Sequence, residues 1–129
     1  MWTSERSRNL PVREAPAEIG TVTLGGDPAG VSLGGERRWL PVYAPGGYSW
    51  RPTSGDKVLV LKAGAEGESP CILGTVQGET ELKPGEVMLK GGDSFVHLGQ
   101  ERLTLGGEVY VNGRSLYNIV RDIVIELLN

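Results

Sequence analysis

The 129-residue sequence contains one cysteine, one histidine and one phenylalanine. A single cysteine excludes an internal disulfide framework and a zinc site built from cysteines. Apolar runs are short, with about four consecutive residues at most, so we expect no membrane-spanning segment. Residues 1–16 lack an apolar core of signal-peptide length. These absences predict a soluble protein that is made in the cytoplasm without a signal peptide.

Neither sign of charge dominates the chain, which has 13 Lys and Arg against 16 Asp and Glu and a net charge of −3. Proteins that grip nucleic acids do so mainly through clustered Lys and Arg, which neutralise phosphates. Because the sequence has an acidic balance and no sustained basic run, we expect no nucleic-acid partner.

Groups that carry out catalysis are scarce. His97 would have to serve in any Ser-His-Asp or Cys-His arrangement. Cys71 stands in an apolar segment, where a thiol is typically inert and buried. We therefore predict no enzyme, no catalytic residue, no metal and no cofactor. One alternative stays open, in which copies of His97 from several chains converge on a symmetry axis and bind a metal.

Glycine is abundant, with 20 residues, and it separates short apolar segments. Five of these segments have strand-like alternation and no helical periodicity, at residues 18–24, 30–33, 37–43, 57–62 and 71–77. Many short strands divided by glycine-rich turns are typical of a small β-barrel or sandwich. Residues 1–16, by contrast, are polar and aperiodic. They predict a flexible N-terminal arm or, alternatively, a docking arm with Trp2 as its anchor.

A repeat occupies residues 87–115, where four short strand-like lines each end near a glycine, at Gly91, Gly99, Gly106 and Gly113. We expect these glycines to form the turns. The expected packing residues of the repeat are Val96, Leu98, Leu103, Leu105 and Val111, and those of the barrel segments are Val58, Val60, Ile72 and Leu73. Strands this short do not make an independent core within one chain. The repeat is therefore either a meander packed on the barrel or a stacked β-structure completed by neighbouring chains.

The last segment is the one part of the sequence with helical periodicity. Its apolar stripe includes Leu116, Val120, Ile123 and Leu127, and Ser115 is placed to cap the N-terminus. A helix of about 13 residues is marginal by itself, so it must pack on something. Its stripe predicts contact either with copies of itself or with its own barrel.

Four aromatic residues lie close together in the sequence at Trp39, Tyr43, Tyr48 and Trp50. Aromatic rings beside arginines can stack against the bases of single-stranded nucleic acid. These four residues are the ligand-stacking candidates of an alternative hypothesis, a monomeric binding module for single-stranded nucleic acid or glycan.

Two motifs carry a family resemblance, GDKVLV at residues 55–60 and ILGTV at residues 72–76. Together with the glycine-punctuated repeat, they resemble the baseplate-assembly-protein-V-like spikes of phage tails. That resemblance implies an all-β chain with an oligonucleotide/oligosaccharide-binding (OB)-like barrel at 17–80. It further implies a trimeric β-prism at 81–113, followed here by an amphipathic helix at 114–129.

The resemblance also implies a function, that of a structural central spike or hub component of a phage tail baseplate or related contractile injection device. The expected assembly is a homotrimer at the tube end of the virion tail. It would contact tail tube or hub proteins and, transiently, the host cell envelope. Family tips often carry a His-x-His iron site, which this sequence lacks, so the resemblance implies a blunt spike without iron.

Overall fold

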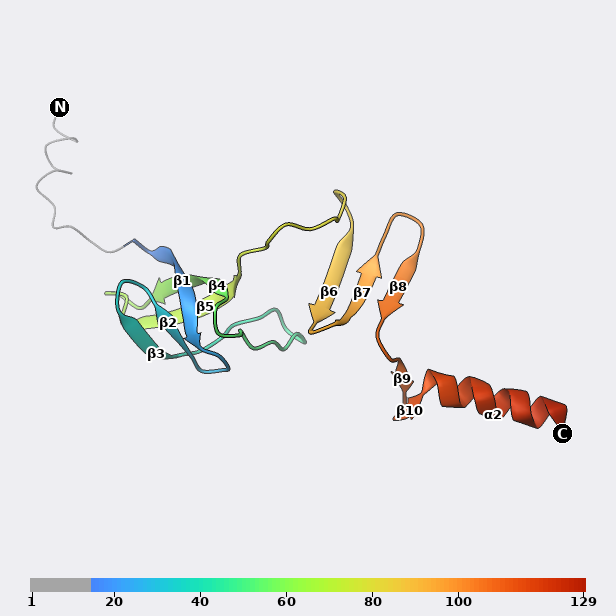
Figure 1. Ribbon diagram of the computed structural model, residues 1–129. Coiled ribbons are helices and arrows are strands. Elements are labelled where there is room, and N and C mark those ends of the chain that lie inside the picture. Colours follow the sequence, from blue (N-terminus) through green and yellow to red (C-terminus); the bar gives the residue numbers. More distant parts are fainter. Residues whose placement is uncertain (1–14) are drawn as a thin grey trace, which may run out of the picture. The chain divides into compact units, whose positions relative to one another are not determined.

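The computed structural model describes residues 15–129, so the predicted N-terminal arm falls almost wholly outside the described residues. The strands are β1 Ala17–Leu24, β2 Ala29–Ser32, β3 Glu36–Leu40, β4 Lys57–Ala63, β5 Ser69–Thr75, β6 Val87–Gly91, β7 Ser94–Leu98, β8 Leu103–Gly106, β9 Tyr110–Val111 and β10 Arg114–Ser115, and the chain ends in helix α2 Leu116–Leu128 (Figure 1). A mostly β protein with a C-terminal helix is thus confirmed. The chain divides into two compact units between Gly78 and Glu79.

The first unit is built on five antiparallel strands in the order β3-β2-β1-β4-β5 (Figure 1). The two ends of this sheet are joined by parallel pairing of Val42 with Ile72. The Tyr43 N–H donates to the Ile72 carbonyl at 2.8 Å, and the Ile72 N–H donates to the Pro41 carbonyl at 2.9 Å. Because its ends are joined, we call this sheet the barrel.

The barrel encloses one small aliphatic core, which follows from alternation along its strands. Inward side chains are almost completely buried and come from all five strands: Val22, Ala29, Val31, Leu40, Val58, Val60 and Ile72. Successive strand residues point to opposite faces, so every second residue of an apolar strand reaches this core. Burial of a Val, Leu or Ile side chain contributes about 1.5–3 kcal/mol, which makes this cluster the main source of stability in the first unit.

The third strand ends earlier than the sequence predicts. The expected segment was 37–43, but β3 stops at Leu40, and Pro41 lies outside the ladder. Proline has no N–H to donate to a neighbouring strand, so it ends the regular pairing. Its carbonyl still accepts the Ile72 N–H that joins the sheet ends.

In the second unit, β6, β7 and β8 form a three-stranded antiparallel meander, whose strands appear in yellow to orange in Figure 1. The expectation that Gly91 and Gly106 form turns is wrong by one residue, because both are the last residues of strands, Gly91 before the turn from β6 to β7 and Gly106 before the bend that leads from β8 toward β9. The positive φ angles that such turns require belong to Gly92, at 58°, and to Gly107, at 107°.

Gly106 has a different reason to be glycine. It is paired with Phe95 across the meander, and a Cβ at Gly106 would lie 2.2 Å from the Phe95 ring. The aromatic ring therefore covers the glycine backbone of the neighbouring strand. Gly99 and Gly113 do lie in turns: the Gly99 N–H donates to the Arg102 carbonyl at 2.9 Å, and Gly113 has a φ of 80°.

A short hairpin leads into the helix. Strands β9 and β10 are joined by Asn112-Gly113, the residue pair that best tolerates two successive positive φ angles. Ser115 caps α2 as predicted, and its side chain accepts a hydrogen bond from the Asn118 N–H at 3.1 Å. None of the helix residues 116–128 is buried.

Candidate functional site: an exposed aliphatic sheet face

The register of the meander places one kind of side chain on one face. Val87 pairs with Leu98, which pairs with Leu103, and Leu89 pairs with Val96, which pairs with Leu105. Directly paired residues of antiparallel strands share a face, as do residues two apart on one strand. The surface that we call the aliphatic face consists of Val87, Leu89, Val96, Leu98, Leu103 and Leu105.

Within the second unit, this aliphatic face is open to solvent. Five of its six side chains are 44–58% exposed, and Val96 on the central strand is half-buried. The same face also carries Gly91 and Ser94, so it bears no charged residue. A contiguous, uncharged apolar surface of this kind is the mark of a protein interface, since monomers rarely leave one uncovered.

Four of the predicted packing residues, Val96, Leu98, Leu103 and Leu105, are brought together on the aliphatic face. The fifth, Val111, lies in β9 of the separate hairpin and is 47% exposed. Sequence reasoning missed the rest of the face, Val87 and Leu89. Their signal was the alternation in residues 87–90, where two branched aliphatic residues stand two apart.

The opposite face of the meander is mixed in character. It holds Met88, His97 and Thr104, paired across the three strands. The His97 Nε2 lies 3.3 Å from Oε1 of Glu86, which precedes β6. His97 therefore lies on the side of the meander that stays open if copies of the chain pack together through the aliphatic face. Among residues 15–129, no group of three His, Cys, Asp or Glu side chains is placed to hold a metal ion.

Glu86 fastens the turn that leads into the meander. Its Oε1 accepts the Lys83 N–H at 3.2 Å, while the Glu86 N–H donates to the Lys83 carbonyl at 3.0 Å. The Lys83 N–H lowers the pKa of the Glu86 carboxyl below its ordinary value of 4.5; burial acts in the opposite direction, and His97 and Gln100 lower the pKa further. The carboxylate is thus the favoured form in the folded protein.

Replacing Glu86 with glutamine is expected to reduce the loss of stability in acid. A lowered folded-state pKa stabilises the fold above the unfolded pKa, and this contribution disappears as the pH falls through the folded-state value. Thermal unfolding between about pH 6 and pH 3 should show the wild type losing its advantage over Glu86→Gln, since only the wild type can protonate this side chain. Parallel curves for the two proteins would contradict the assigned role of Glu86.

The helix presents a second unburied apolar surface. Leu116, Val120, Ile123 and Leu127 lie along one side of α2, and each is between 45% and 80% exposed. Ile119 and Val124 widen this stripe, and 3.6 residues per turn give an apolar surface over about half of the circumference. Arg114 and Arg121 contact Asp122 on the other side. Packing of α2 against one neighbouring element would leave part of so wide an apolar surface exposed.

The four aromatic residues grouped by the sequence do not form one platform. Trp39 and Tyr43 line one hollow, whereas Tyr48 and Trp50 line another. Trp50 is half-buried and packs against the barrel core, so it has a structural role. Trp39, Tyr43 and Tyr48 are exposed.

Comparison with known proteins adds no relative to these observations. The chain matches no protein-family model and no curated protein. In the described part, residues 15–129, no helix has the length and apolar character needed to cross a membrane.

Proposed function

We propose that the protein is a structural component that assembles as a homotrimer, acting as a short central spike or hub piece of a phage tail baseplate or a related contractile injection device. The observation that carries this proposal is the aliphatic face of the meander. Its side chains are regular in register, free of charge and half exposed. Burying the exposed half of each contributes on the order of 1 kcal/mol, so six per chain favour assembly by several kcal/mol.

Identical copies are the fitting cover for this face. The aliphatic face carries no charge, and three such faces turned toward a common axis bury one another. A closed rotational arrangement of this kind is the usual form of homo-oligomers.

The helix supports self-association through its apolar stripe, which none of the helix's own contacts bury. In a heptad assignment, Leu116 and Ile123 occupy d positions, while Val120 and Leu127 occupy a positions. Leu127 at a with Ile123 at d is a combination typical of trimers and tetramers, whereas Val120 at a with Leu116 at d is typical of dimers, so the heptad residues alone do not set the number of copies. The apolar half-circumference of α2 also suits contact with two neighbouring helices at once.

The barrel supports the family resemblance. Five antiparallel strands, with the first paired to the second and fourth and a bridge between the two ends of the sheet, support the proposal of an OB-like barrel. The motif residues Val58, Val60 and Ile72 are core residues of this barrel. An OB-like barrel followed by a short meander with an uncovered apolar face fits a spike that does mechanical rather than chemical work, with tail tube or hub proteins as its neighbours in the virion.

The solution mass is the direct test of this proposal. We expect light scattering on a size-exclusion column to give three times the 13.8 kDa mass of the chain. This mass should persist on dilution, because obligate interfaces are large and apolar. A 13.8 kDa monomer would overturn the trimer and leave the alternative, a monomeric OB-fold binding module for single-stranded nucleic acid or glycan.

A further inference from the structure

Trp39 occupies an unusual backbone position. Its φ is 65°, in the left-handed region that bulky side chains rarely adopt. The pairing of β2 with β3 shifts register between Ala29 and Val31, opposite this residue, so β3 contains a bulge there. Bulges of this kind re-aim a side chain, and left-handed non-glycine residues are typical of functional sites.

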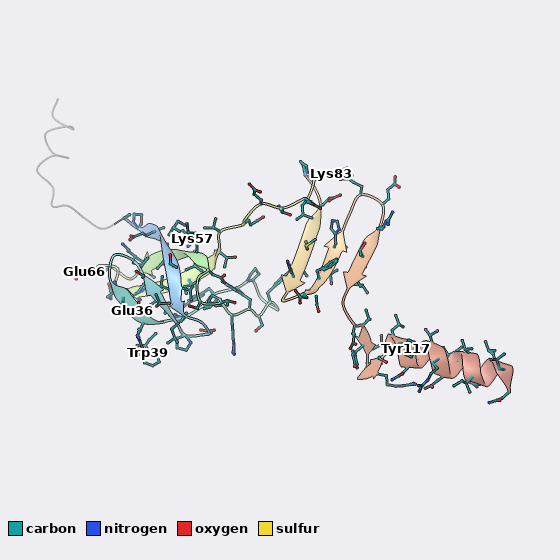
Figure 2. The ribbon with its side chains drawn as sticks, in the orientation of Figure 1. Glu36, Trp39, Lys57, Glu66, Lys83 and Tyr117 are labelled. Atoms are coloured by element: carbon teal, nitrogen blue, oxygen red, sulfur yellow. The ribbon has the colours of Figure 1, made fainter. Side chains whose placement is uncertain are left out.

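The bulge exposes the indole ring instead of burying it. Trp39 is 76% exposed, and Figure 2 shows it pointing away from the barrel. It lines a hollow of about 430 Å³ together with Tyr43, Arg37, Arg38 and Glu68. Strand β3, the segment that follows it and the loop between β4 and β5 therefore contribute two aromatic rings and three charged groups to one site.

Glu68 is held in place by its own loop. The Glu66 N–H donates to its carboxylate at 2.8 Å. The backbone N–H groups of Glu68, Glu66 and Ala65 lower the pKa of the Glu68 carboxyl, with burial acting in the opposite direction. The hollow is thus lined by a carboxylate that its own loop holds in place and by two arginines with forked donors, and a group fixed in advance cuts the ordering cost of binding a hydroxylated ligand.

We propose that this hollow binds a neutral saccharide, whose ring stacks on Trp39 and Tyr43 and whose hydroxyls bond to Arg37, Arg38 and Glu68. The C–H face of a sugar carries slight positive charge and suits the negative face of an aromatic ring. Hydroxyls both donate and accept, so they match a carboxylate and guanidinium groups in one site.

Other occupants fit the hollow less well. A nucleic acid would bring phosphates toward the ionised Glu68, and the chain offers no basic track beyond this site. A second copy of the chain would have to bury charged groups at the centre of the contact, where interfaces are depleted of charge. The saccharide proposal does not depend on the number of copies in the assembly. It names a class of molecule, the saccharides of a cell envelope, that the protein would contact.

In the test, the whole chain is titrated with three neutral oligosaccharides, namely maltohexaose, cellohexaose and chitohexaose. Binding is measured by NMR. Trp39→Asn is the key variant, because asparagine tolerates the left-handed backbone and removes only the indole. We expect the wild-type protein to bind at least one of these oligosaccharides with a Kd in the millimolar range. Trp39→Asn should bind the same oligosaccharide at least tenfold more weakly. Tyr48→Ala, an exposed aromatic in the other hollow, is the matched control and should bind as the wild type does.

Three outcomes would overturn the proposal: no binding by any panel member at millimolar concentration, binding that survives Trp39→Asn, or equal losses in Trp39→Asn and Tyr48→Ala. A fourth contrary outcome would come from acrylamide quenching of tryptophan fluorescence, compared between the wild type and Trp39→Asn. If acrylamide does not quench the fluorescence of Trp39 in the assembled protein, a neighbouring copy covers the hollow, and the proposal of a saccharide site is wrong. The light-scattering mass is measured on the same samples, so a failed trimer and a failed saccharide site give separate results.

Discussion

Replacing Leu105 with aspartate is expected to convert the trimer into monomers. Leu105 is 50% exposed in the single chain and pairs with Val96 in the middle of the aliphatic face. If that face is buried between copies, the substitution places an unpaired carboxylate in an apolar contact in every chain. The cost is at least about 3 kcal/mol per chain, or more than a hundredfold in the association constant for each copy.

Thr104→Asp is the matched control for Leu105→Asp. Thr104 is the neighbouring residue of the same strand and pairs with His97 on the opposite face. Both variants place the same residue in β8, so any general weakening of the strand by aspartate is common to them. Light scattering should show a monomer for Leu105→Asp and an unchanged mass for Thr104→Asp. The same mass for all three proteins would remove the aliphatic face from the interface and with it the main support for the spike.

Shortening Ile72 to alanine is expected to destabilise the barrel by about 2–5 kcal/mol. Ile72 is completely buried, and its backbone makes both hydrogen bonds that join the sheet ends. Loss of three carbons leaves a cavity in a core of only seven residues, with few neighbours able to move in. For a unit of this size the melting temperature should fall by roughly 10–30 °C.

Leu73→Ala is the control for Ile72→Ala. The adjacent Leu73 loses the same number of carbons, but the expectation that it packs in the core is wrong, because it is 43% exposed and points to the other face of its strand from Ile72. We expect a loss below about 1 kcal/mol there, because its side chain is only partly removed from water in the folded state. Denaturation is followed through Trp50, which packs against the core. Equal losses in the two variants would contradict the assignment of Ile72 to the core and Leu73 to the outside of the barrel.

Several structural features could be predicted from local sequence alone. The helix begins after Ser115 as expected, because a capping hydroxyl and a 3.6-residue apolar period are both local signals. The five barrel strands were expected close to where they lie, since alternation marks a half-buried strand. Errors of one to three residues occur where glycine or proline ends a strand, as at Gly91, Gly106 and Pro41.

Features that depend on pairing could not be predicted in the same way. The aliphatic face includes Val87 and Leu89 only because β6 is aligned with β7 in a particular register, and a shift of one residue would turn them to the other face. The sequence likewise grouped four aromatics, whereas the fold separates Trp39 and Tyr43 from the other pair. Their neighbour Glu68 comes from a loop that is distant in the sequence.

For this protein, the sequence by itself determined the local elements: glycine-divided strands, a capped terminal helix and a scarcity of catalytic groups. These depend on backbone preferences and on the period of the apolar residues, which are written within a few positions of each element. The tertiary structure alone decided which of those apolar residues the chain buries and which it leaves open. Strand register and sheet closure bring together residues far apart in the chain, so the aliphatic face of the meander and the left-handed Trp39 beside its hollow exist only once the strands are paired.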